Sequence, residues 1–256
     1  MKKTTTLILI LLFSLPSFSQ YDEEISVSDA LQYMLNLRTS AATIVKDYIY
    51  KGLKVKYVSK NIDINLADSE MALLGLEIYT ESHPEIKPLI KKITMLRIKG
   101  RMMIIHKPDK KKMAGMLQVL DKVMKVNNMV IGKLRKMSSI QTLDYQYSAN
   151  ELEILAQKLA ILYALKSNKK EDVTQKMQQA MKSFKLNLNK IFSYSNNSPE
   201  QTQLIKNIQS NWLMLEKIAN NNSLNMINTI YILTNKISND AHKLSLMYYK
   251  VSKEAM

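Results

Sequence analysis

The chain has 256 residues and no cysteine, which excludes disulfide bonds, thiol nucleophiles and thiolate metal sites. Its five glycines and five prolines are too few for the turns of a β-sandwich, so the composition predicts an all-α fold. The formal charge of +15 allows an anionic partner. The lysines are spread along the chain, however, which favours solvated helix faces over a dedicated anion-binding patch.

The beginning of the chain predicts a secretory signal peptide over residues 1–19. A positively charged start precedes an apolar run at residues 7–15, and small residues then stand at Ser17 and Ser19. We expect cleavage near Ser19–Gln20, and the alternative is an uncleaved anchor. No later stretch has the roughly 18 apolar residues of a membrane helix. The expected mature chain is therefore exported to the periplasm or secreted, has no transmembrane anchor and does not meet nucleic acid.

Four helices are predicted in the first part of the mature chain. The first extends from a cap at Ser26, which has Asp29 three residues on as in a capping box, or at Ser28 to about Tyr57, and the second ends near Thr80. The third follows Pro84, which suits a first helical position, and the fourth follows a turn at residues 107–109. The apolar lines expected to face the core are Leu31, Met34, Ala41, Val45 and Tyr48 in the first helix and Met71, Leu74 and Ile78 in the second.

Four more predicted helices follow, and they match the first four. Residues 83–93 (HPEIKPLIKKI) align with residues 198–208 (SPEQTQLIKNI) at an offset of 115 positions in the sequence. Residues of the first and fifth helices also match at this offset. An internal duplication of a four-helix unit explains the match most simply. We therefore predict tandem antiparallel four-helix units at residues 26–138 and 142–254.

Two charged residues stand on apolar helical lines, where packing side chains are expected. Arg38 lies on the line of the first helix, and the offset of 115 places Glu153 at the equivalent position. A buried charge without a partner is very costly, so Arg38 must find an anion in the protein or from solution. Two interpretations stay open: a ligand site, or an ion pair or outward-reaching side chain that only serves the fold.

The sequence offers no recognisable catalytic, metal or cofactor site. Its three histidines share no metal-ligand spacing, and there is no glycine-rich phosphate loop, GxSxG, HExxH or Glu-x-x-His pattern. We therefore expect no enzyme activity, no metal and no cofactor. His242 lies beside the apolar line of the last helix, where it can act as a partly buried donor, and Trp212 is expected to be a packing anchor.

Residues 148–165 (SANELEILAQKLAILYAL) resemble the first helix of the N-terminal domain of type IV pilus methyl-accepting chemotaxis transducers. The residues that fit the family pattern are Ala149, Leu155, Gln157, Lys158, Ala160 and Tyr163 in this segment and Arg38, Lys46 and Tyr48 in the first half. The resemblance covers most of residues 26–254 and implies repeated four-helix bundles. The relatives include the periplasmic sensor region of nitrate/nitrite sensor kinases, in which an arginine of the first helix binds the anion at a dimer interface. Arg38 stands at the matching position, and Thr43 stands at that of the second family arginine.

The resemblance implies an exported sensory-type bundle that binds a small anionic ligand and signals through a protein partner in the envelope. The ligand-binding residues that it implies are Arg38, Glu153, Gln157 and Lys158, and it allows a homodimer. The alternative is an envelope interaction or scaffold protein that has lost ligand binding. The divergence of both copies of the motif favours this alternative.

Overall fold

The computed structural model describes residues 24–55, 58, 62–167, 173–220 and 226–255. These residues form eight α-helices and no strand, so the predicted all-α class is confirmed. The helices are α1 (Val27–Gly52), α2 (Ile62–Ser82), α3 (Lys87–Ile104), α4 (Lys110–Lys136), α5 (Thr142–Ser167), α6 (Thr174–Phe192), α7 (Pro199–Asn220) and α8 (Ile227–Glu254). None of the helices in this part of the chain is long and apolar enough to cross a bilayer. The predicted signal peptide lies outside the described residues.

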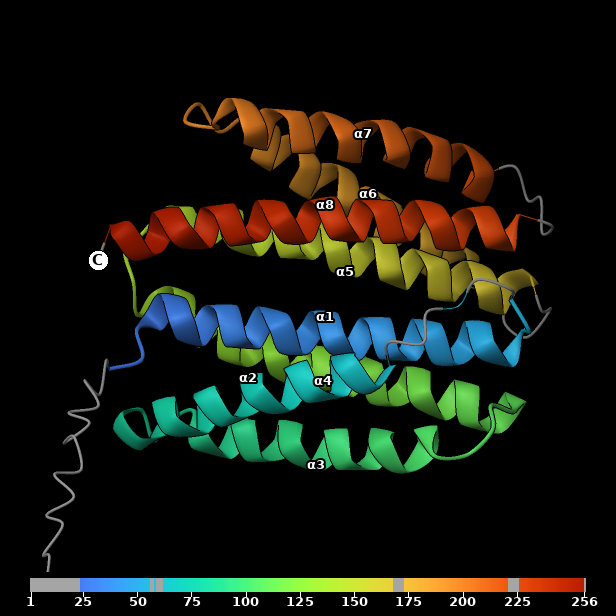
Figure 1. The fold of residues 1–256 in the computed structure, drawn as a ribbon, viewed down its shortest axis with the longest axis horizontal. Coiled ribbons are helices and arrows are strands. Elements are labelled where there is room, and N and C mark those ends of the chain that lie inside the picture. Colours follow the sequence, from blue (N-terminus) through green and yellow to red (C-terminus); the bar gives the residue numbers. More distant parts are fainter. Residues whose placement is uncertain (1–23, 56–57, 59–61, 168–172, 221–225, 256) are drawn as a thin grey trace, which may run out of the picture.

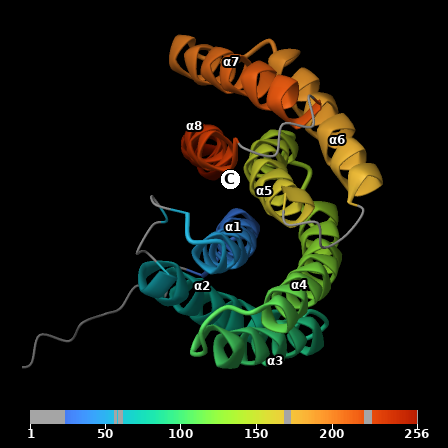
Figure 2. The same ribbon diagram turned by 90° about the vertical axis from the view of Figure 1, so that its right-hand side faces the viewer.

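The helices pack as two neighbouring groups that meet along their first helices. In one group α1 packs on α2 and α4, and in the other α5 packs on α6 and α8. The groups join because α1 also packs on α5 and, to a smaller extent, on α8. Seen end-on, α2 to α7 follow an arc, and α1 and α8 lie on its inner side (Figure 2). Helix α1 is therefore surrounded by other helices.

The sequence of α1 explains its start and its burial. Ser26 and Asp29 form the predicted capping box, in which each side chain accepts from the backbone N–H of the other residue. The predicted apolar line is buried except for the half-buried Ala41, and Leu31 and Met34 are fully inaccessible. The helix ends at Gly52, five residues earlier than predicted, and Lys54 takes a left-handed backbone conformation with φ of 58°.

The predicted apolar line of α2 is wrong. Its members are exposed, Met71 by 73%, Leu74 by 60% and Ile78 by 50%. The buried face instead carries Leu76 and Gly75, and a Cβ atom on Gly75 would lie only 2.5 Å from the ring of Tyr33 on α1. Glycine permits this close approach without a shift of the Tyr33 ring, and the face that contains Gly75 packs on α1 while the three exposed residues turn away.

Helices α1 and α5 are the best-matched pair of the two groups. Both have 26 residues, and both their first and their last residues are 115 positions apart. They run side by side in the same direction (Figure 1). Asn150 Nδ2 on α5 lies 3.5 Å from the carbonyl oxygen of Leu35, its counterpart on α1, so residues that correspond in the two halves lie close together. This spacing is the one expected for duplicated units, and the duplication itself remains a prediction.

Candidate functional site

Helices α1 and α8 run antiparallel (Figure 1). A polar cleft lies between them, and hydrogen bonds join the two helices on either side of it. At one end Tyr249 of α8 donates to Asp29 of α1. At the other end Tyr231 donates to Asp47 over 3.0 Å, and Lys46 donates to Asn235. Between these contacts the helices stand apart and leave a cleft of about 660 Å³. This volume falls in the range of small-molecule sites.

Four helices contribute to the cleft. Helix α5 supplies Glu153 and Gln157, both 2% exposed, as part of its floor. The side chains that line the rest of the cleft include Tyr33, Thr39, Thr43, Lys46 and Asp47 of α1, Asp68 and Met71 of α2, and Tyr231, Asn235, Ser238, His242 and Leu246 of α8. The floor is buried, whereas Asp68 and Met71 are exposed. The cleft is therefore a polar depression with a solvent-accessible rim.

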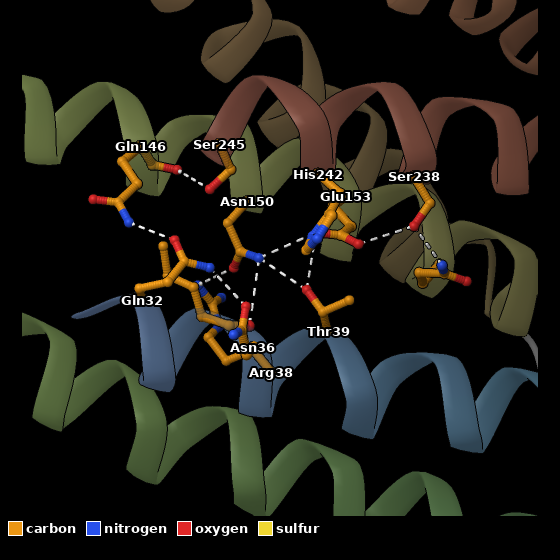
Figure 3. Close-up of polar contacts among 12 residues, drawn as sticks. Gln32, Asn36, Arg38, Thr39, Gln146, Asn150, Glu153, Ser238, His242 and Ser245 are labelled. Atoms are coloured by element: carbon orange, nitrogen blue, oxygen red, sulfur yellow. Dashed lines mark hydrogen bonds and ion pairs between the residues drawn. The ribbon is translucent and has the colours of Figure 1, made fainter. Parts of the chain in front are cut away.

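Glu153 is the centre of a hydrogen-bond network that links α1, α5 and α8 (Figure 3). Its Oε2 accepts from Thr39 Oγ1 over 2.9 Å and from Asn150 Nδ2 over 3.3 Å. Its Oε1 accepts from Ser238 Oγ over 3.2 Å. His242 Nδ1 lies 3.6 Å from Oε2, and its hydrogen bond to Glu153 raises the pKa of His242 above its usual value. The buried carboxylate thus has donors on both of its oxygens.

Gln157 extends this network but keeps one atom without a protein partner. Its Nε2 donates to Ser238 Oγ over 2.7 Å. Its Oε1 is buried and has no hydrogen-bond partner among the described residues. Buried polar atoms are nearly always paired, so an unpaired one beside a cleft indicates a point where a donor is missing.

Lys46 and Asp47 form the second charged group of the cleft, and each is only 1% exposed. Lys46 Nζ lies 3.9 Å from Asp47 Oδ1 and 4.7 Å from the centre of the Tyr231 ring. Burial lowers the pKa of Lys46 to about 8, against the opposing effect of the nearby carboxylates. Burial likewise raises the pKa of Asp47. Oδ2 of Asp47 has no hydrogen-bond partner in the described part of the chain.

Arg38 finds its anion within the protein. It forms an ion pair with Glu151, lies 3.4 Å from Asn150 Oδ1 and stacks over the ring of Tyr147 at 5.3 Å. It is not among the residues that line the cleft. This arrangement matches the second of the two interpretations of Arg38, in which an ion pair within the protein serves the fold.

The structure brings together two of the four residues predicted to bind a ligand. Glu153 and Gln157 meet at the floor of the cleft, whereas Arg38 and the half-buried Lys158 do not line it. The sequence reasoning missed Lys46 and Asp47 as a site. The signal that could have found them is a charged pair inside the otherwise apolar run of residues 44–50.

No group of three or more metal-ligating side chains is placed to hold an ion within the described residues. Comparisons of the chain with protein-family models, with curated proteins and with solved structures found no match. The resemblance to chemotaxis transducer domains therefore remains a prediction from the sequence.

Proposed function

We propose that the chain is an exported helical-bundle protein that binds a small polar solute in the cleft between α1 and α8 and reports through a protein partner. The observation that carries the proposal is a cleft of about 660 Å³ whose lining residues include two buried oxygens without a hydrogen-bond partner in the described part of the chain, Oδ2 of Asp47 and Oε1 of Gln157. A buried polar atom without a partner costs about 1 to 3 kcal/mol. A solute that donates to these atoms recovers that free energy on binding.

The position of the cleft supports the proposal that solute binding is signalled to a protein partner. It lies between the two helix groups, and its walls come from α1 and α2 on one side and from α8 on the other. A solute that contacts both walls would favour one separation of α1 and α8. Such a differential contact is what a ligand needs to shift a conformational equilibrium.

The exposed apolar line of α2 supports the proposal that the chain binds a protein partner. Met71 lines the cleft and also begins the exposed apolar line that continues through Leu74 and Ile78. Exposed apolar patches of this kind mark interaction surfaces. A partner that covers this line would touch a side chain that borders the solute. The same line favours the second candidate function, an envelope scaffold protein that binds its partner without a solute.

A thermal-shift screen of the chain from Gln20 tests the proposal. The panel contains amines, amino acids, sugars, carboxylates, nitrate and nitrite. A solute at about 100 times its dissociation constant adds about 2.7 kcal/mol of stability. Thr43→Trp fills the cleft and should abolish the shift, whereas Gln178→Trp on the exposed face of α6 should preserve it. A panel without any shift, or a shift equal in both variants, would leave the scaffold function as the better explanation.

A further inference from the structure

We infer that the cleft binds an organic cation with a primary ammonium group and that Asp47 is its counter-ion. This inference rests on the proposed function and adds the chemical class of the solute. Three observations carry it: the charges that line the cleft, the hydrogen bonds that its carboxylates already make, and the apolar side chains near its rim.

The cleft has a negative surplus on a strongly basic protein. Three carboxylates line it, those of Asp47, Asp68 and Glu153, against the two basic side chains of Lys46 and His242. Carboxylates therefore outnumber cations even when His242 is protonated. The chain as a whole has a formal charge of +15. A local field of the opposite sign on such a surface attracts cations to this place.

Asp47 is the floor carboxylate with hydrogen-bonding capacity left. Glu153 has donors on both oxygens, whereas Asp47 accepts a hydrogen bond from Tyr231 alone among the described residues, with Lys46 Nζ at 3.9 Å from its Oδ1. Its Oδ2 has no hydrogen-bond partner among the described residues, so Asp47 can accept a further donor. Gln157 Oε1 is a second open acceptor. An ammonium group carries three donors and no acceptor, which matches this need.

The cations of the region, by contrast, are already engaged. Lys46 donates to Asn235, faces the Tyr231 ring and lies 3.9 Å from Asp47 Oδ1, and His242 is paired with Glu153. An anionic solute would have to compete with these protein acceptors. The groups of the cleft that lack a hydrogen-bond partner are acceptors, so they favour a solute that donates hydrogen bonds over one that accepts them.

Apolar side chains complete the lining. Tyr33, Met71 and Leu246 line the same cleft as the polar groups. They can cover methylene groups while an ammonium reaches the floor. An alkyl amine with one or more ammonium groups fits this combination, and putrescine and spermidine are suitable probes.

Isothermal titration calorimetry of the chain from Gln20 with putrescine and spermidine tests the inference, with glucose, nitrate and acetate as comparison solutes. Asp47→Asn keeps the shape of the side chain and an acceptor for Tyr231 but removes the charge. We expect it to weaken amine binding roughly tenfold to a hundredfold, the range for a hydrogen bond to a charged group. Asp121→Asn, the same change at an exposed site on α4, should leave binding unchanged.

A second variant reduces the negative surplus of the cleft without touching the buried network. Thr43 lines the cleft and is half-buried, so Thr43→Lys adds a positive charge there and should abolish amine binding. It keeps the test decisive if Asp47→Asn fails to fold. Amine affinity that is equal in Thr43→Lys and the parent chain would overturn the inference.

The comparison solutes distinguish failure of the ammonium inference from failure of the proposed solute-binding function. Binding of glucose, nitrate or acetate that Thr43→Trp blocks, without amine binding, would overturn the cationic solute and support the cleft as a binding site. Absence of heat from all the probes would count against the ammonium class. The wider thermal-shift panel then decides whether the cleft binds any other solute.

Discussion

Arg38 and Glu151 form a buried ion pair whose disruption should cost about 3 kcal/mol. The side chain of Arg38 is 2% exposed and that of Glu151 is 15% exposed. Arg38→Ala leaves the carboxylate of Glu151 and the amide oxygen of Asn150 without their donor, and it removes the stack on Tyr147. Removing one partner of a buried pair costs about 3 to 5 kcal/mol. Water reaches Glu151 in part, which places the expected loss at the lower end.

The chain contains a matched control for this experiment. Arg101 Nη1 lies 2.6 Å from Glu70 Oε1, but the two side chains are 60% and 52% exposed. Because exposed pairs contribute at most about 1 kcal/mol, Arg101→Ala should cost far less than Arg38→Ala. Urea unfolding followed by circular dichroism gives both free energies by linear extrapolation. The double variant Arg38→Met with Glu151→Leu should recover most of the loss, because an apolar pair replaces the charges together.

Two results would refute this reasoning. Equal losses of unfolding free energy in Arg38→Ala and Arg101→Ala would show that burial does not determine how much the Arg38–Glu151 pair contributes to stability. Unchanged stability of Arg38→Ala together with loss of solute binding would show that Arg38 serves a ligand, as the resemblance to nitrate sensors implies. The pair seen in the structure predicts the opposite: a large loss of stability, with the affinity of the folded protein for its solute retained.

Three further predictions concern other parts of the chain. The raised pKa of His242 means that its pair with Glu153 stabilises the fold fully below about pH 6.5 and loses this effect as the pH rises through the raised value. Unfolding of the parent chain and His242→Gln should therefore differ most at low pH. Trp212 is 2% exposed and stacks on Phe184 at 3.7 Å, so Trp212→Ala should cost about 3 to 5 kcal/mol in urea unfolding. Mass spectrometry of the exported protein should find Gln20 as its first residue.

Helical periodicity predicted the buried face of α1 but not that of α2. In α1 one apolar line dominates, so the three- and four-residue spacing identifies the core face. In α2 apolar residues occur on more than one face, and two such lines compete. The contact between Gly75 and the Tyr33 ring selects between them, and it joins residues 42 positions apart in the chain. Local pattern contains no information about that contact.

The candidate site was only half predictable, for a related reason. Arg38 and Glu153 were noticed because each breaks an apolar line. Lys46 and Asp47 are neighbours, and adjacent residues of a helix point about 100° apart, so at least one of a charged pair usually faces solvent. Both are buried because α1 has other helices around it and no wide solvent face. The number of helices around α1 depends on the whole fold and cannot be read from its own sequence.

The position that the offset of 115 relates to the polar cleft is lined by apolar residues instead. At the offset of 115, Lys46 and Asp47 correspond to Ile161 and Leu162 of α5, both fully buried. Tyr231 and Asn235 of α8 correspond in the same way to Met116 and Leu120 of α4, and all four apolar residues belong to one hydrophobic cluster. The place equivalent to the cleft is thus packed with side chains. If the halves arose by duplication, their interiors have diverged, and one solute per chain is the stoichiometry that this arrangement supports.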